Sequence, residues 1–415
     1  MNSATKQREL VPELRFSGFG GEWNSEKIST ITSDVTYGLT VRPDYLTEGI
    51  PLISAREIKT GKIKYDEAPK ISLIDYNKLS DKAKPRLGDL FLTKTGTIGF
   101  SSVVDKAVKA AITQNIAIIR IKDSQKIFNL FLLHQFKTST FQKNILSKVN
   151  QSTIMDLQLG DIKKTDVTFP EYAEQHKIAD FLGSVDAWLN NLRQQKTAFE
   201  SYKRGMTQKL FSQEVRFKRD DGNDFSIWKK GCLLDYLERP ATYGIVKAGD
   251  FVLSGVKMVR GGDIKNGRIT QELVMVSDKK SLEYKRTITK VNDVLIALVG
   301  YPGESAVVTE DLAGANISRA VGLLRTGENI DPQYLVHFLN SSVGRREFLR
   351  PGAGSAQFVV NLKDLNQLRL PVLNKGEQIE IANFLNTLDQ TITAKTEEIT
   401  KVEEWKKGLM QKMFV

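Results

Sequence analysis

The chain has 415 residues, of which 40% are apolar, and it carries a formal net charge of +11 at pH 7. This length and apolar content predict two to three globular domains with proper cores, and they exclude a disordered chain. The positive charge favours a polyanionic partner, but an ordinary solvated surface explains it about as well as nucleic acid does.

Cysteine content and hydropathy exclude further classes. Cys232 is the only cysteine, which excludes a disulfide framework and a thiolate metal cluster and favours a reducing compartment. Residues 1–9 lack the apolar core of a signal peptide, and no stretch approaches the ~20 consecutive apolar residues of a membrane span. We therefore expect a cytoplasmic protein.

The first predicted domain, residues 1–170, is rich in short β-like runs and glycine turns. Residues 57–63 place a glycine turn between two β-prone stretches, which predicts a hairpin. Residues 89–92 form another apolar run, and Gly96 and Gly99 follow it. The strong alternation in these runs predicts a mixed α/β unit with a curled or barrel-like sheet.

The second predicted element, residues 171–213, is one long helix. Its apolar residues recur at alternating steps of four and three, which is the pattern of a coiled-coil seam. Lys196 and Lys203 occupy two seam positions, where a lysine costs stability but fixes register and orientation. Such a helix would span about 57 Å at 1.5 Å per residue, which is the length of a spacer rather than of an average helix.

The rest of the chain repeats the first half. Residues 377–414 match residues 174–211 without a gap, 203 positions further on. The recurring pairs include Glu-Gln, Ile-Ala and Phe-Leu near the start of the helix and Gln-Lys near its end. The second domain is therefore placed at residues 214–371, and the second helix at residues 372–415.

The segments ahead of the two helices also align, more loosely. Residues 57–63 match residues 263–269, and residues 112–120 match residues 317–325. A period of half the chain indicates a domain duplication with pseudo-two-fold symmetry rather than a solenoid. The end of each helix precedes the same Leu/Val-Arg-Phe motif in circular order, so we expect the two ends of the chain to lie close together.

Since each long helix carries one apolar stripe, we expect the two helices to pack on each other. The alternative is that each is a separate amphipathic helix covering its own domain.

These features together resemble the specificity subunit of type I restriction and modification systems, over almost the whole chain. The resemblance rests on residues 12–19 (PELRFSGF) followed by Trp23, and on residues 407–414 (KGLMQKMF). It also rests on a proline followed by Glu-Gln and Ile-Ala-x-Phe-Leu, at residues 170–182 and again at residues 371–385. Each motif is short, but together they occur in order and at one spacing.

The resemblance implies an α/β (α+β) fold with two globular mixed α/β target recognition domains, separated by two long antiparallel coiled-coil helices. Each domain would recognise one half of a split asymmetric DNA sequence. The implied partners are double-stranded DNA, two methyltransferase (modification) subunits and restriction/translocase subunits, with no membrane. S-adenosylmethionine, ATP and Mg²⁺ would belong to the partner subunits, so no cofactor, metal or catalytic residue is expected in this chain.

Candidate DNA contacts are side chains on predicted turns, because Arg and Lys neutralise phosphates and Arg, Gln and Asn form paired hydrogen bonds to base edges. In the first domain they are Tyr37, Arg42, Arg56, Lys59, Lys62, Lys64, Lys94, Thr95, Thr97 and Gln114. In the second domain they are Tyr243, Lys247, Arg260, Lys265, Arg268, Tyr301 and Arg319. A solvated surface role is about as good an explanation for any one of them.

The polar loops differ between the repeats. Residues 94–97 (KTGT) correspond to residues 298–301 (LVGY), and Gln114-Asn115 corresponds to Arg319-Ala320. Residues 150–153 (NQST) correspond approximately to residues 354–357 (GSAQ). Two readers of different half-sites would need such differences, and drift after duplication explains them equally well.

A self-contained DNA-modifying enzyme is the alternative interpretation. Residues 16–20 resemble a loop that binds S-adenosylmethionine, and residues 331–334 (DPQY) resemble an adenine methyltransferase motif, but neither has the expected flanking structure. Pro43-Asp44 with Glu57-Ile58-Lys59 fits a loose nuclease pattern. A second alternative is an independent DNA-binding regulator.

The histidines offer no catalytic or metal-binding cluster. His134 and His337 occupy equivalent positions of two predicted helices, where packed histidines are far commoner than ligands.

Overall fold

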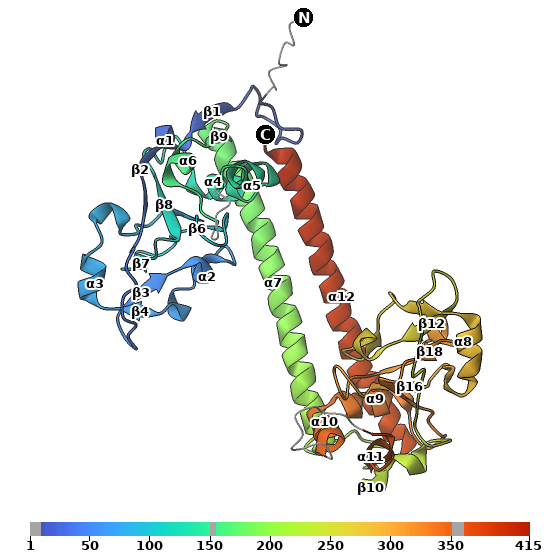
Figure 1. Ribbon diagram of the computed structural model, residues 1–415. Helices are drawn as coiled ribbons and strands as arrows, with labels where there is room; N and C mark the ends of the chain where they lie inside the picture. Colours follow the sequence, from blue (N-terminus) through green and yellow to red (C-terminus); the bar gives the residue numbers. More distant parts are fainter. Residues whose placement is uncertain (1–9, 150–154, 351–360) are drawn as a thin grey trace, which may run out of the picture. The chain divides into compact units, whose positions relative to one another are not determined.

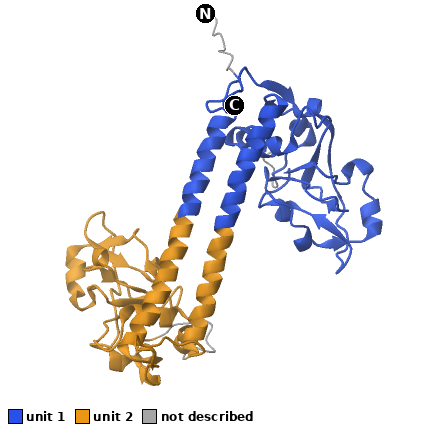
Figure 2. Ribbon diagram, turned by 180° about the vertical axis from the view of Figure 1, so that it is seen from behind, with its two compact units in different colours: residues 1–192, 398–415 blue, residues 193–397 orange. Residues whose placement is uncertain are grey.

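The computed structural model describes residues 10–149, 155–350 and 361–415 (Figure 1). The chain divides into two compact units, unit 1 with residues 1–192 and 398–415, and unit 2 with residues 193–397 (Figure 2). Both divisions fall inside long helices. The polar segments at residues 150–153 and 354–357 lie outside the described residues.

The strands of unit 1 form a four-stranded, a three-stranded and a two-stranded sheet. The elements of this unit are β1 (Asn24–Lys27), α1 (Ile28–Ile31), β2 (Thr32–Tyr37), β3 (Ile50–Ile53), α2 (Ala55–Ile58), β4 (Lys70–Ile71), α3 (Leu73–Asn77), β5 (Leu90–Thr93), β6 (Ser101–Val103), β7 (Ala111–Ile112), β8 (Ile116–Ile121), α4 (Asn129–Phe136), α5 (Ser139–Leu146), α6 (Leu159–Lys163) and β9 (Asp166–Phe169). Helix α7 (Tyr172–Phe211) begins in unit 1 and ends in unit 2.

Unit 2 has nearly the same sequence of elements. They are β10 (Lys229–Cys232), β11 (Thr242–Tyr243), β12 (Val256–Val259), β13 (Ile264–Lys265), β14 (Arg268–Ile269), β15 (Val274–Val276), α8 (Asp278–Glu283), β16 (Val294–Ala297), β17 (Ser305–Val307), β18 (Asn316–Ile317), β19 (Val321–Leu324), α9 (Pro332–Asn340), α10 (Ser342–Leu349), α11 (Leu362–Asn366) and β20 (Arg369–Val372). Helix α12 (Lys375–Met413) begins in unit 2 and ends in unit 1.

The sheets of the two units share one topology. A four-stranded antiparallel sheet has the order β2-β8-β5-β6 in unit 1 and β11-β19-β16-β17 in unit 2. A three-stranded sheet has the order β4-β3-β7 in unit 1 and β15-β12-β18 in unit 2, and its last pair is parallel in both. The fold is therefore mixed α/β and duplicated, as predicted.

The core of each globular domain includes the end of a long helix. In unit 1, Met410, Met413 and Phe414 of the C-terminal segment join the cluster around Phe131 and Leu182. In unit 2, Leu210 and Phe211 take the same place beside Tyr334 and Leu385. Burying these apolar side chains fixes each helix end to its domain, which is why both long helices contribute to both units.

The C-terminal end of α12 is followed in space by the Leu-Arg-Phe motif near the start of the sequence, as the predicted circular order requires. In unit 1 the backbone N–H of Leu14 donates to the carbonyl of Lys412 at 2.8 Å. The segment around Leu14 thus lies beside the end of α12, as residues 215–217 follow the end of α7 in the other repeat.

The long helices pack on each other within each unit. In unit 1, Val185, Leu189 and Leu192 of α7 cluster with Ile399 and Val402 of α12. The N-terminal part of α7 thus meets the C-terminal part of α12, and in unit 2 the C-terminal part of α7 meets the N-terminal part of α12, so the helices run antiparallel. This pairing favours the predicted seam over two separate amphipathic helices.

The seam lysines form ion pairs. Lys406 Nζ lies 2.5 Å from Asp186 Oδ1 in unit 1, and the equivalent Lys203 Nζ lies 2.6 Å from Asp389 Oδ1 in unit 2. Lys196 pairs within its own helix with Glu200 at 3.7 Å. No helix in the described part of the chain is both long and apolar enough to cross a membrane.

Candidate nucleic-acid interface

Three loops of unit 1 meet at one end of its four-stranded sheet. The backbone N–H of Lys94, after β5, donates to Asn115 O at 2.8 Å, and the N–H of Gln114 donates to Leu39 O, after β2, at 2.9 Å. Gly38 makes the approach possible, because a Cβ atom there would lie 1.8 Å from the carbonyl oxygen of Ile112. Tyr37, Lys94 and Gln114 are thereby brought together, although they are distant in the sequence.

Helix α2 borders this group of loops. Its first turn is fixed by a capping box, in which Glu57 Oε2 accepts hydrogen bonds from Ser54 N at 2.8 Å and Ser54 Oγ at 2.6 Å. The N–H of Thr113 donates to Ile53 O at 3.0 Å, which holds the start of α2 against the β7–β8 turn. Arg56 lies in the first turn of α2 and is exposed.

The side chain of Lys94 is held inside this group. Its Nζ lies 2.8 Å from Asp156 Oδ1 and 5.9 Å from the centre of the Tyr37 ring. Thr95 Oγ1 donates to the same Asp156 oxygen at 2.5 Å. Burial alone would raise the pKa of Asp156, but the hydrogen bonds from Lys94 and Thr95 and the charge of Lys94 outweigh it and leave the pKa lowered. Asp156 is therefore ionised and paired.

Unit 2 repeats the convergence with other side chains. The N–H of Leu298 donates to Ala320 O at 2.8 Å, and the N–H of Arg319 donates to Ile245 O at 2.9 Å. A Cβ atom on Gly244 would lie 1.7 Å from Ile317 O, so this approach also requires glycine. The loops present Tyr243, Arg319 and Tyr301 to solvent, and Lys265 Nζ lies 5.5 Å from the Tyr301 ring centre.

Several other candidates make contacts of their own. Arg42 stacks on Tyr45 at 5.3 Å, Lys59 lies 6.0 Å from the Phe100 ring, Lys64 pairs with Glu67 at 2.8 Å, and Arg260 pairs with Asp263 at 3.0 Å. Lys62, Thr97 and Lys247 are exposed.

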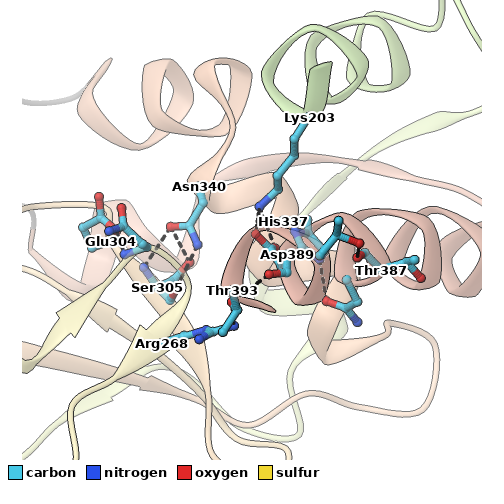
Figure 3. A network of polar contacts seen from close by, with 12 residues as sticks. Lys203, Arg268, Glu304, Ser305, His337, Asn340, Thr387, Asp389 and Thr393 are labelled. Carbon is cyan, nitrogen blue, oxygen red and sulfur yellow. Dashed lines mark hydrogen bonds and ion pairs between the residues drawn. The ribbon is translucent and has the colours of Figure 1, made fainter. Parts of the chain in front are cut away.

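Arg268 lies beside the long helix of unit 2. It donates to Thr393 of α12, in a polar region where Asn340 bonds Ser305 and Lys203 pairs with Asp389 (Figure 3). His337 Nε2 hydrogen-bonds Asn386 Oδ1 at 2.8 Å in the same region. The β13–β14 hairpin therefore contacts the helix through Arg268, while Lys265 of the same hairpin lies beside Tyr301.

Asp156 was missed by sequence reasoning. Its partners Lys94 and Thr95 lie 62 and 61 positions away, so no local motif marks it. Backbone hydrogen bonds from Leu157 N to Lys94 O at 2.7 Å and from Gly96 N to Met155 O at 2.9 Å bring the two segments together.

Comparison with known families gives a match over most of the chain. Residues 40–198 and 243–404 match the sequence model described as the type I restriction modification DNA specificity domain. The two matched stretches correspond to the two repeats.

Individual relatives carry related names. The type I restriction enzyme EcoBI specificity subunit of Escherichia coli is 26% identical over 70% of this chain, and the match spans 64% of that relative's length. The putative type I restriction enzyme MjaX specificity subunit of Methanocaldococcus jannaschii is 24% identical over 94% of this chain and 92% of the relative.

Solved structures show the same fold. The S subunit of a type I restriction-modification system from M. genitalium superposes with a TM-score of 0.61 at 16% identity, over 98% of this chain and 99% of that one. A chain from a study of complex assembly and conformational transition of the type I R-M system has a TM-score of 0.57 at 16% identity, over 94% of this chain and 97% of that one.

Proposed function

This chain belongs to the type I restriction modification DNA specificity family, and we propose that it is the non-catalytic specificity subunit of a type I restriction-modification complex. Each target recognition domain recognises one half of a bipartite asymmetric DNA site. The chain thereby positions partner adenine methyltransferase and restriction subunits on that site, and it contributes recognition rather than chemistry.

One observation carries this proposal. The same loops converge on the same sheet end in both units, yet their side chains differ: Lys94 and Gln114 in unit 1 are replaced by Leu298 and Arg319 in unit 2. A conserved scaffold that presents different hydrogen-bonding groups suits two readers of different base sequences, because base edges are distinguished by their donor and acceptor patterns.

The proposed partners are double-stranded DNA, two methyltransferase (modification) subunits and restriction/translocase subunits. The pseudo-two-fold repeat supports two copies of one partner, since each repeat offers an equivalent surface. S-adenosylmethionine, ATP and Mg²⁺ act in those partners, which flip and methylate the target adenine. The complex works in the cytoplasm, where its DNA is.

The enzyme alternative is weakened by the positions of the residues it needs. The Glu57 carboxylate accepts hydrogen bonds at the start of α2, and Asp331 caps α9 by accepting from the N–H groups of Gln333 and Tyr334, both at 3.0 Å. Both carboxylates therefore stabilise helix ends. In the described part of the chain, no group of three or more His, Cys, Asp or Glu side chains is placed to hold a metal ion.

The test is to sequence methylated adenines in DNA from cells that contain the chain together with its methyltransferase subunits. We expect a split motif that depends on this chain. Gln114→Ala should weaken discrimination between bases at one position of one half of the motif, and Arg319→Ala at one position of the other half. Each loss of discrimination should be roughly 5- to 150-fold. Methylation that shows no split motif, or activity of the purified chain alone with a methyl donor or Mg²⁺, would overturn the proposal.

A further inference from the structure

The charge of Lys94 is already neutralised by an ion pair within unit 1. Its side chain is 11% exposed, and its Nζ contacts both Asp156 Oδ1 at 2.8 Å and Thr95 Oγ1 at 3.1 Å. The Asp156 side chain is 25% exposed, and it also accepts a hydrogen bond from Gln158. The pair lies among the loops that carry Tyr37 and Gln114, where a DNA-binding surface would be expected to present free positive charge.

A lysine in this state is a poor phosphate ligand. Binding a phosphate would require Lys94 to leave Asp156, and the partly buried carboxylate would then lose its counter-charge and one of its hydrogen-bond donors. The Asp156 charge would also repel the incoming phosphate. The loop can then gain affinity mainly through hydrogen bonds to base edges, which depend on sequence, rather than through the sequence-independent phosphate term.

The equivalent loop of unit 2 reaches a similar result differently. Leu298 occupies the position of Lys94, and it carries no charge to mask. The residue directly after β5 in unit 1 is thus paired with a counter-charge, and the residue directly after β16 in unit 2 is uncharged.

We propose that Asp156 is a positioning residue for recognition of the first half-site: it holds Lys94 and Thr95 in place and keeps Lys94 from binding phosphate. This inference rests on the proposed function, since it assumes that unit 1 binds DNA through these loops. It assigns Asp156 a role in discrimination between sequences rather than in raw affinity.

The first test is Asp156→Asn in the full chain, copurified with its methyltransferase subunits. The freed Lys94 should take a phosphate, so the slope of log Kobs against log salt concentration becomes steeper by about 0.9 and binding to unrelated duplex tightens. Selection from a random-sequence duplex pool should show relaxed preference at first half-site positions, by roughly 5- to 150-fold, with the second half-site unchanged.

Asp81→Asn is the matched control. Asp81 pairs with Lys84 on the surface of the same unit at 3.0 Å, and its loss raises the net charge by the same amount. It should leave the base preferences unchanged and the salt slope close to that of the original protein. Equal behaviour of the two variants would overturn the proposal, because the effect would then be one of net charge.

Lys94→Met tests the same idea without removing the carboxylate. If Lys94 contacts no phosphate, this variant weakens discrimination at the first half-site and leaves the salt slope unchanged. A slope that becomes shallower by about 0.9 identifies Lys94 as an ordinary phosphate contact and overturns the proposal. This arm remains decisive if Asp156→Asn fails to fold.

The outcomes also separate this inference from the proposed function. If the original complex selects no split sequence at all, the proposed function fails. If it selects one, and Asp156→Asn and Lys94→Met both match it in salt slope and base preference, only the role of Asp156 fails.

Discussion

Units 1 and 2 agree where charges are buried and differ where loops are exposed. Two largely buried ion pairs occur at equivalent positions, Arg15–Glu174 with Arg216–Glu377 and Arg120–Asp89 with Arg325–Asp293. The partly exposed pair Lys406–Asp186 is also repeated, as Lys203–Asp389. Loss of one member of a buried pair strands the other charge, so such pairs resist change after a duplication. Exposed loops carry no such penalty and are free to diverge.

The units also differ at buried positions beside these pairs. In unit 2, Trp228 Nε1 donates to Glu377 Oε2 at 2.8 Å, whereas the equivalent Trp23 Nε1 in unit 1 is buried without a partner among the described residues. His337 bonds Asn386, whereas in unit 1 the position of Asn386 is occupied by Gly183, which has no side chain to offer His134. At these two positions, the buried polar side chains of unit 2 therefore have hydrogen-bond partners that their equivalents in unit 1 lack within the residues that the structure describes.

The largest expected effect is at the buried glutamates. Glu174→Ala and Glu377→Ala should each lower the free energy of unfolding by about 3–5 kcal/mol, because each leaves a largely buried arginine without its counter-charge. Glu377→Ala should cost about 1–3 kcal/mol more than Glu174→Ala, since it also leaves Trp228 Nε1 without an acceptor. Hydrogen exchange of peptides from each unit measures the two losses separately.

A double variant provides the control for this prediction. Trp228→Phe combined with Glu377→Ala removes the orphaned indole N–H, so the added loss should largely disappear. Equal losses for the two single glutamate variants would contradict the assigned difference between the units.

The next effect depends on pH. Burial and the charge of Lys137 lower the pKa of His134 to about 3, while Asp186 opposes this. Below pH 6.5 the unfolded chain binds a proton that folded unit 1 does not, so the unit loses stability as pH falls from 6.5 towards 3, by about 1.4 kcal/mol per pH unit.

His134→Gln should flatten this pH dependence in unit 1 when stability is measured between pH 7 and pH 5. Burial also lowers the pKa of His337, but the hydrogen bond to Asn386 raises it in part, so unit 2 should be less sensitive to acid. Gly183→Asn should bring unit 1 closer to unit 2. An unchanged slope in His134→Gln would place the acid sensitivity elsewhere.

The smallest effect concerns the seam ion pairs. The Lys406 side chain is 13% exposed and the Lys203 side chain 26%, while both aspartates are about one third exposed. Solvent screening limits the coupling energy in each pair to about 0.2–1 kcal/mol, and the Lys406 pair should be the stronger. Double-mutant cycles with Lys→Met and Asp→Asn measure it. A stronger coupling for Lys203 would reverse the comparison.

Sequence reasoning predicted the repeated long helices well, but the hairpin predicted at residues 57–63 was wrong, because helix α2 begins that segment and only the equivalent residues 264–269 form a hairpin. The Glu-Gln motifs occur twice because Glu174 and Glu377 bind arginines, and Gln175 and Gln378 each donate to two backbone carbonyls. Lys203 was recognised as a departure from the apolar pattern of its helix, but its partner Asp389 lies on the other long helix. A pattern along one helix cannot show which residue of a second helix faces it.

The candidate interface stays a prediction, and the sequence could indicate only part of its geometry. Tyr37, Lys94 and Gln114 were selected one by one from their residue types, and the structure brings them together. Arg268 was selected by the same reasoning, as a basic residue on a predicted turn, but it lies against α12. The difference is set by which other segment of the chain each turn packs against, and local sequence does not determine that.

By itself, the sequence determined that the chain is a duplicated mixed α/β protein with two long helices, because periodicity and repeated motifs are local properties of the residues. Only the tertiary structure decided that Lys94 is neutralised by Asp156, that Glu57 and Asp331 serve as helix caps, and that His134 lacks the partner His337 has. Each of these depends on contacts between side chains and backbone groups fixed by packing, and such contacts decide whether a charged group is free to bind another molecule.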